Sequence, residues 1–519
     1  MKFFVSDTEK LDNKFSKWYY WTDKKCKIFK NNERLVIYNG YTIEKSLDEY
    51  VQTDPHLLEH ANGKYCAVIL EKNYVKVIVD YFCQTKIFYR HTNRFEVTNQ
   101  VYLFPFTTGD IDAGEIIKRC RIPKEFKKYA TIRNWCDWSN NGNLPEGQYN
   151  HIKCKTVFKN TFVLQPDHLL LFDGKLNIKR IHDVEEKMVS RLNQKIPTFR
   201  TSIEAEDYIH KCMEDHADVI KKNYNNIVST ISEGIDSCLQ DQYFPNSKRL
   251  MYHYKNPETG PINYKENIIN EYKLKNIDIQ LDTLDLSNLT NIALDVVNDP
   301  NLFWCDTLPT IWQLNNLDNK PDLFMYGQNG DQMFMHKPSL LYPYLFSRQI
   351  NTSKTPEQVL EESKNCYGST RNLWSFKGTR NAHGGWEIDR EFVSEGNTYD
   401  YDYWLGYIKQ HKGKDLGEWF SSKCLPDFYI REISHNTDIE GASIYADKRI
   451  FFIVYGMSNE VRLDNMRHVS IQKNILKRKF NTDFKTRFKD EAGFNIYDMV
   501  KPMVLKTIEY CLKAHLPKA

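Results

Sequence analysis

The stretch of sequence that decides the fold is "IVSTISEGIDSCLQ", residues 227–240. It begins with β-branched and apolar residues typical of a buried strand, and after a tight Ser-Glu-Gly it continues into residues that fit the start of a helix. A helix N-terminus presents backbone N–H groups and a positive dipole to an anion. Gly234 lets the backbone approach that anion, and the hydroxyls of Ser232 and Ser237 can donate to it. The stretch therefore predicts a pyrophosphate-binding loop.

An acid stands inside this loop. Phosphate alone would repel Asp236, so the anion-binding interpretation needs a bridging Mg²⁺, which prefers oxygen ligands such as carboxylates. The alternative is an ordinary helix after a strand, with Ser232 or Asp236 as its N-cap. The short stretch fits both interpretations.

The segments around the loop predict a parallel sheet. A helix is expected from residue 203 to residue 220, because Thr201 and Glu204 form a capping-box pattern and apolar residues recur at helical spacing: Ile203, Ile209, Met213, Ala217 and Ile220. Further strands are expected at 249–254, 277–285 and 322–326, with a helix at 265–276. Strands that alternate with helices indicate a doubly wound α/β sheet, whose ligands bind at the carboxyl ends of the strands.

The first part of the chain has a different sequence pattern, typical of short strands. Residues 34–41, 64–90 and 153–180 are rich in β-branched and aromatic residues, with turns predicted at 71–73 and 173–174. A polar segment follows Arg180. We expect an α+β sandwich domain over 1–195 and an α/β domain over 196–519, the latter mostly helical after Trp374.

Composition excludes several classes of protein. The 519 residues are 41% hydrophobic and 27% charged, with no apolar run near the length of a membrane-spanning helix. The N-terminus lacks the pattern of a signal peptide, so a cytoplasmic location is expected. A net charge of +3 gives no reason to expect a nucleic-acid partner. The 12 cysteines form no CxxC pair, which favours reduced thiols over a zinc site or disulfides.

Three segments together resemble one family. Residues 232–237 resemble the Ser-Gly-Gly-x-Asp-Ser pyrophosphate loop of the ATP-pyrophosphatase group, and "YGQNGDQMF", residues 326–334, is similar to the second signature of class B asparagine synthetases. Residues 428–480 follow the same family's C-terminal pattern at Arg431, Glu440, Asp447, Arg449 and Lys473. Signatures in the right order are more specific than any one of them.

The first domain resembles the glutaminase domain of this family at Gly63, Ala67, Asp80 and Tyr89. A working glutaminase of this kind uses a cysteine that is exposed when Met1 is removed, and here residue 2 is Lys2. The domain in this respect resembles that of β-lactam synthetases, which has lost the nucleophile. We expect no glutaminase activity and a structural role.

The resemblance implies an ATP- and Mg²⁺-dependent ligase that adenylates a small-molecule or peptide carboxylate and transfers the acyl group to ammonia or another amine. The sequence does not define the oligomeric state, and a homodimer is one option. It implies three sets of site residues: Lys473, Gln328 and Glu440 as catalytic; Ser232, Gly234, Asp236, Ser237 and Gly327 as ATP- and pyrophosphate-binding; and Asp236 and Asp331 as Mg²⁺ ligands. Without the resemblance, Lys473 could equally be a surface lysine of a basic helix. Asp331 could equally be an acid that forms an Asx-turn after a strand.

The sequence also departs from the family. Glu233 replaces the middle glycine of the loop, and Gln328 stands where asparagine synthetases have an acid that handles a proton. Glutamine orients a substrate but is no general base at neutral pH. Two alternatives follow: a catalytically degraded homologue that serves as a nucleotide-binding or scaffold protein, and an intramolecular amide cyclase of the β-lactam or lasso-peptide type. A tRNA-modifying enzyme is disfavoured by the balanced charge.

Overall fold

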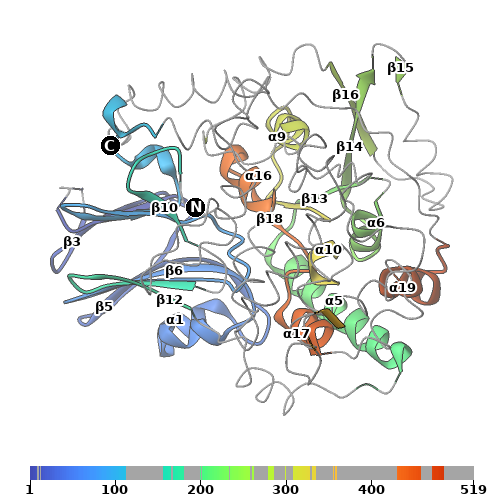
Figure 1. Cartoon of the computed structure of the whole chain (residues 1–519), viewed down its shortest axis with the longest axis horizontal. Helices are drawn as coiled ribbons and strands as arrows, with labels where there is room; N and C mark the ends of the chain where they lie inside the picture. The colour runs from blue at the N-terminus through green and yellow to red at the C-terminus, as the bar shows by residue number, and fades with distance from the viewer. Residues whose placement is uncertain are drawn as a thin grey trace.

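The computed structural model describes residues 1–8, 11, 13–112, 156–164, 168–180, 199, 201–232, 234–256, 260–261, 279–285, 299, 308–327, 330–334, 355, 357–358, 429–456 and 470–483. Figure 1 shows two stacked sheets at the N-terminal end of the chain and a third sheet, flanked by helices, beside them. We refer to the first two sheets and the elements that cover them as the N-terminal sandwich.

Both sheets of the N-terminal sandwich are antiparallel. The first has the order β10-β8-β9-β1-β3-β2, and the second has the order β12-β11-β7-β6-β5-β4. The strands of the first sheet are β1 (Phe3–Ser6), β2 (Asn13–Phe15), β3 (Trp18–Thr22), β8 (Phe88–His91), β9 (Phe95–Thr98) and β10 (Thr161–Val163). Those of the second are β4 (Lys27–Lys30), β5 (Arg34–Thr42), β6 (Gly63–Glu71), β7 (Val75–Val79), β11 (His168–Phe172) and β12 (Leu176–Arg180).

The sandwich core follows from the two-residue period of its strands. On β6, Cys66, Val68 and Leu70 face the first sheet and share a cluster with residues such as Phe3 and Trp18. The alternate side chains of β6 pack instead beneath α1 (Leu47–Thr53) and the 3₁₀ helix η1 (Pro55–His60). Two short 3₁₀ helices, η2 (Val101–Leu103) and η3 (Thr108–Asp110), follow β9. Since both faces of β6 are covered, the middle of the strand, from Tyr65 to Leu70, is apolar and buried.

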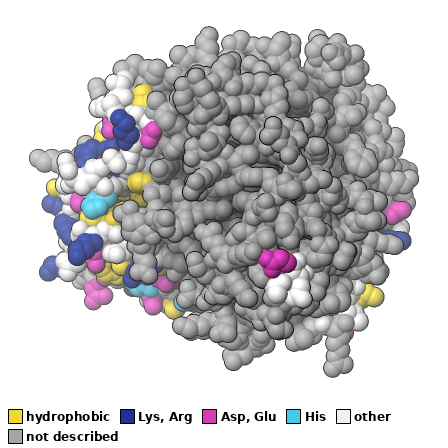
Figure 2. All heavy atoms as spheres, viewed as in Figure 1, with side chains coloured by type: hydrophobic (Ala, Val, Ile, Leu, Met, Phe, Trp, Pro, Cys, Tyr) yellow, Lys and Arg dark blue, Asp and Glu magenta, His cyan; other side chains and the backbone are white. Residues whose placement is uncertain are grey.

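The predicted turns of the sandwich are confirmed. Glu71 closes the turn between β6 and β7 by donating its N–H to the carbonyl of Tyr74, at 3.0 Å. Asp173 and Gly174 join β11 to β12. Figure 2 shows basic and acidic side chains interspersed on the described surface of this part of the molecule, and exposed pairs such as Lys27 with Asp48 contribute to that surface.

The third sheet carries the predicted loop at its centre. Strand β13 lies between β14 and β17 and is parallel to both, β16 is parallel to β14, and β18 is parallel to β17. The chain runs outward from β13 first through β14 and β16, and then to the other side through β17 and β18. The carboxyl ends of β13 and β17 therefore form a topological switch point, where open α/β sheets bind ligands. The strands are β13 (Ile227–Thr230), β14 (Lys248–Asn256), β15 (Gly260–Pro261, antiparallel to β14), β16 (Ile279–Asp285), β17 (Leu323–Met325) and β18 (Glu440–Ala442).

The strands predicted at 249–254, 277–285 and 322–326 correspond to β14, β16 and β17, and those predictions are confirmed. The predicted helix at 265–276, the domain boundary after residue 195 and the beginning of the helical region after Trp374 lie outside the described residues. In the part of the chain that is described, no helix has the length and apolar character needed to cross a membrane.

The helix that precedes β13 is confirmed as α5 (Ser202–Asn223), and the Thr201 hydroxyl accepts the N–H of Glu204 as predicted. Ile209, Met213, Ala217 and Ile220 are buried. Ile203 is 53% exposed, and the buried face of α5 begins at Ala205. In the described part of this half, the other helices are α6 (Ile235–Gln242), α9 (Leu308–Asn315), α10 (Gly330–Met333), α16 (Tyr429–Thr437), α17 (Lys448–Gly456) and α19 (Ser470–Phe480).

Candidate functional site

The loop between β13 and α6 is closed by its own two serines. The Ser237 hydroxyl lies 2.9 Å from that of Ser232 and accepts the Ser232 N–H at 3.1 Å. The Gly234 N–H donates to the Ser232 hydroxyl at 3.1 Å. The N-cap of α6 is Gly234, which has no side chain to cap the helix, so the alternative with Ser232 or Asp236 as an ordinary N-cap is wrong. The serines instead shape the backbone ahead of the helix.

The second predicted signature lies directly against this loop. Thr230, at the end of β13, donates its hydroxyl to the carbonyl of Met325, at the end of β17, at 3.1 Å. Two residues later, a Cβ on Gly327 would come within 2.3 Å of the Cα of Ser237. Only glycine fits such an approach without displacing the helix. The structure thus brings Gly327 and Ser237 together, as the sequence predicts.

Gln240 fastens the two segments to each other. In the amide orientation that matches donors with acceptors, its side chain bonds to the N–H and carbonyl of Tyr326 and to the N–H of Gly327, each at 3.2 Å. Gln240 lies on α6 and is fully buried. Sequence analysis did not single it out.

Asp236 is the point at which four elements meet. Gln472 of α19 donates its side-chain amide to Asp236 Oδ1. A Cβ on Gly330, the first residue of α10, would lie 2.2 Å from the same oxygen. Tyr445, which follows β18, donates its hydroxyl to the backbone carbonyl of Asp236 at 2.7 Å. Sequence analysis missed Gln472 and Tyr445; the signal for Gln472 was its position directly before Lys473.

Two other predicted site residues lie on these same elements. Asp331 follows Gly330 in α10, so its backbone is adjacent to the Asp236 carboxylate. Lys473 follows Gln472 in α19 and is half-buried, and α19 packs against α6. Gln328 and Glu233 lie outside the described residues.

Glu440 lies elsewhere. It is the first residue of β18 and pairs with Leu323, the first residue of β17, so it stands at the amino edge of the sheet while the loop stands at the carboxyl edge. Its carboxylate accepts from Lys64 at 2.9 Å, from the Tyr224 hydroxyl at 2.6 Å and from Asn39. These contacts assign Glu440 to the interface with the N-terminal sandwich, and the structure does not bring it to the loop.

The surroundings of Glu440 keep it ionised. Burial alone would raise the pKa of this carboxyl, but the charge of Lys64 and the hydrogen bonds from Tyr224 and Lys64 outweigh it and lower the pKa to about 2. An ionised, fully paired carboxylate is a structural group rather than a proton acceptor.

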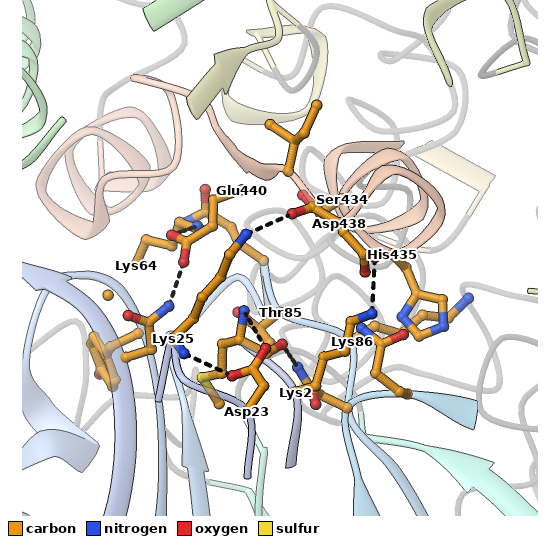
Figure 3. A pocket seen from close by; sticks show the side chains of 18 of the residues that line it. Lys2, Asp23, Lys25, Lys64, Thr85, Lys86, Ser434, His435, Asp438 and Glu440 are labelled. Atoms are coloured by element: carbon orange, nitrogen blue, oxygen red, sulfur yellow. Dashed lines mark hydrogen bonds and ion pairs between the residues drawn. The ribbon is translucent and has the colours of Figure 1, made fainter. Parts of the chain in front are cut away.

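A cavity of about 410 Å³ lies at this amino edge, between the N-terminal sandwich and the segment from Ser434 to Glu440. Figure 3 shows charged side chains from both halves lining it. Lys2 donates to Asp438 at 2.8 Å, and Lys86 donates to Asp299 and Glu432 at 2.7 and 2.9 Å. The side chain at position 2 is thus an ion-pair partner of the other half.

Burial lowers the pKa of His435, which also lines the cavity, to about 4. The imidazole is therefore neutral at neutral pH, although Asp299 nearby favours the charged form. The cavity accordingly combines lysines, carboxylates and one neutral histidine.

Comparisons with known proteins give remote structural likenesses. No family model matches the chain, and no curated protein matches its sequence. Among solved structures, the chain is similar to glutamine phosphoribosylpyrophosphate amidotransferase from B. subtilis, solved with ADP and GMP, at 8% identity and a TM-score of 0.16. The match covers 58% of this chain and 63% of that one. A TM-score this low defines no common fold.

Proposed function

We propose that this protein is an AMP-forming amide ligase: it adenylates a carboxylate with ATP, releases pyrophosphate, and transfers the acyl group to ammonia or another amine. The proposal rests on one observation: the loop between β13 and α6, which contains Ser232 and Ser237, lies against Gly327 and Gly330 at the switch point of the third sheet. Gly330 there packs against the side chain of Asp236. The proposed fold class is an N-terminal glutaminase-like αββα sandwich followed by an ATP-pyrophosphatase-type α/β domain, in a cytoplasmic protein.

The loop suits a pyrophosphate group. The helix dipole of α6 favours an anion at its N-terminus, and Gly234 leaves the approach to the first-turn N–H groups open. Ser232 and Ser237 now bond to each other, and each hydroxyl can rotate to donate to a phosphate oxygen instead. The close packing of Gly327 fixes the second segment beside them.

The residues present also suit Mg²⁺. This ion is usually held by one or two carboxylates together with substrate phosphates. Asp236 supplies one carboxylate, and Asp331 is the proposed second ligand. Among the described residues no group of three or more acidic, His or Cys side chains gathers, and a site completed by phosphate oxygens needs none. Bound there, Mg²⁺ would neutralise negative charge on the phosphates.

The proposed reaction has two displacements. A carboxylate oxygen attacks the α-phosphorus of ATP as the bond to pyrophosphate breaks. The amine nitrogen then attacks the acyl carbon, the bond to AMP breaks, and the nitrogen loses a proton. The protein contributes positioning and charge neutralisation. Lys473, on the helix that contacts Asp236, is the proposed cation near the α-phosphate, and Gln328 the proposed group that orients the acyl acceptor.

The test is release of pyrophosphate from MgATP, screened over carboxylates beginning with aspartate, with ammonium as the amine. Asp236→Ala is expected to abolish the release. The matched control is Asp218→Ala, which removes an exposed carboxylate on α5, and it should release pyrophosphate like the unmodified protein. Equal release by both variants would reject the proposed site.

A second candidate is a scaffold that binds nucleotide without turnover, and the ion pair of Lys2 with Asp438 favours it, because position 2 serves the interface instead of catalysis. The two candidates are separated by adding MgATP alone. A rise in melting temperature without pyrophosphate release from any substrate would favour the scaffold.

A further inference from the structure

We propose that the N-terminal sandwich positions the nucleotide-binding loop, through Asn62 and Tyr41, which hold residues 443–447 against the start of α6. We name residues 443–447 the bridging segment. The proposal rests on the proposed function for its nucleotide, and it gives a role to a domain from which we expect no glutaminase activity.

Asn62 holds the C-terminal end of the bridging segment. Its amide nitrogen donates to Asp447 Oδ1 at 2.7 Å, and its amide oxygen accepts the N–H of Lys448 at 3.0 Å. Asn62 lies just before β6 and is 3% exposed, and Asp447 is fully buried. The amide nitrogen and the amide oxygen of Asn62 thus both form hydrogen bonds with the other half of the molecule.

Asp447 keeps a second anchor when Asn62 is replaced. Arg449 donates to Asp447 at 2.8 Å and reaches α5 through Asp215 at 3.1 Å. The charge of Asp447 therefore remains compensated without Asn62. Replacement of Asn62 should loosen the bridging segment without leaving a buried unpaired charge.

Tyr41 holds the middle of the bridging segment through His216. The Tyr41 hydroxyl lies 2.9 Å from His216 Nε2, and His216 Nδ1 lies 3.2 Å from the carbonyl of Ile444. Because a carbonyl only accepts, Nδ1 carries the proton and Nε2 accepts from Tyr41. Burial lowers the pKa of His216, which favours this neutral form.

The bridging segment in turn contacts both nucleotide-binding segments. Tyr445 donates its hydroxyl to the Asp236 carbonyl at 2.7 Å, and its ring meets Phe334, just after α10, edge to face at 5.9 Å between centroids. A continuous set of contacts thus runs from Asn62 and Tyr41 to the residue that would hold Mg²⁺. Buried polar contacts of this kind define geometry more than they add stability.

The experiment uses the full chain and two matched pairs of variants. Asn62→Leu and Tyr41→Phe remove contacts to the bridging segment. Asn99→Leu and Tyr65→Phe remove buried hydrogen bonds that stay inside the sandwich, from Asn99 to Met1 and from Tyr65 to Leu58. Circular dichroism establishes that each variant is folded.

The first readout is the Kd for MgATP by titration calorimetry. We expect Asn62→Leu and Tyr41→Phe each to weaken binding about tenfold, or roughly 1.4 kcal/mol, because each loosens the segment that holds the nucleotide-binding loop. The controls should lower the melting temperature and leave Kd unchanged. Folded Asn62→Leu protein with the Kd of the unmodified chain would overturn the proposal.

The second readout is hydrogen exchange of residues 231–240, which requires no nucleotide. Exchange should be faster in Asn62→Leu than in Asn99→Leu, and equal rates would overturn the positioning role. If the unmodified chain binds no MgATP, the proposed function fails, and the exchange rates still decide whether the sandwich orders the loop.

Discussion

At the carboxyl edge of the third sheet, the ends of β13 and β17 meet hydroxyl groups and glycines, whereas at the amino edge of the same sheet Glu440 meets the ammonium group of Lys64. The carboxyl edge presents the backbone N–H groups at the N-terminus of α6, where we propose that an anion binds. The amino edge borders a cavity whose lysines already have partners in the other half of the chain. The comparison separates a proposed anion site from an interface in which charge is already matched.

Replacing Lys64 with Met should give the largest effect, because it leaves Glu440, whose side chain is only 22% exposed, without its cation. Removal of one partner of a buried ion pair costs about 4 kcal/mol, and the Lys64 side chain is only 5% exposed. Urea unfolding measures the change. The double variant Lys64→Met, Glu440→Gln should recover most of the lost stability, and a double variant as unstable as the single one would show that the pair is not the cause.

The amino edge should also respond to pH through His435. The pKa in the folded protein is lowered to about 4, while the unfolded value is near 6.5, so the neutral form stabilises the fold. That stability is present above pH 6.5 and is lost as the pH falls through 4, a change of about 3 kcal/mol. His435→Gln should flatten this part of the curve of unfolding free energy against pH.

The groups that face His435 are Asp299, Lys86, Asp438 and Lys2, and they remain in the variant. The difference between the two pH curves therefore reports the histidine. Parallel curves from pH 7 to pH 4 would contradict the prediction.

At the carboxyl edge, the close approach of Gly327 can be tested with one methyl group. Gly327→Ala must displace the backbone of Ser237 and should destabilise the fold by about 2 kcal/mol, as overpacking does. It should also abolish MgATP-dependent pyrophosphate release. Gly109→Ala is the control, because the nearest atom to its new Cβ lies 3.6 Å away. Equal unfolding midpoints for the two variants would contradict the observed packing.

The smallest effect is expected from Gln472→Ala, which removes a hydrogen bond to the Asp236 carboxylate. The concentration of Mg²⁺ needed for half-maximal pyrophosphate release should rise about tenfold, since bonds to charged groups are worth about 1.5 kcal/mol. Asn474→Ala, on the same helix, removes a bond to Glu206 and should leave the Mg²⁺ midpoint unchanged. The same midpoint in both variants would show that Gln472 has no part in the site.

Local patterns in the sequence predicted the elements well. The strand-to-helix junction at 227–240, the turn after Glu71 and the buried face of α5 all follow from spacing of two or about four residues. The prediction that Ile203 belongs to the buried face of α5 is wrong, because periodicity does not show where a packed face begins or ends.

Contacts between distant segments had no such signal. Asn62 and Asp447 are 385 positions apart, and Gln472 and Asp236 are 236 apart. A hydrogen bond across that distance leaves no periodic trace, so each residue looks like an ordinary polar side chain. Glu440 was assigned to the site for a related reason: its family position was readable, but the edge of the sheet on which it lies was not.

The ion pairs of the amino edge join residues that are synthesised at very different times. Lys86 belongs to the sandwich, and its partner Glu432 follows 346 positions later. At usual rates of synthesis, the sandwich waits roughly 20 to 70 s before that carboxylate emerges. During this interval Lys2 and Lys64 also lack Asp438 and Glu440, so this edge of the sandwich carries the charge of these lysines without their interface partners until the last part of the chain is made.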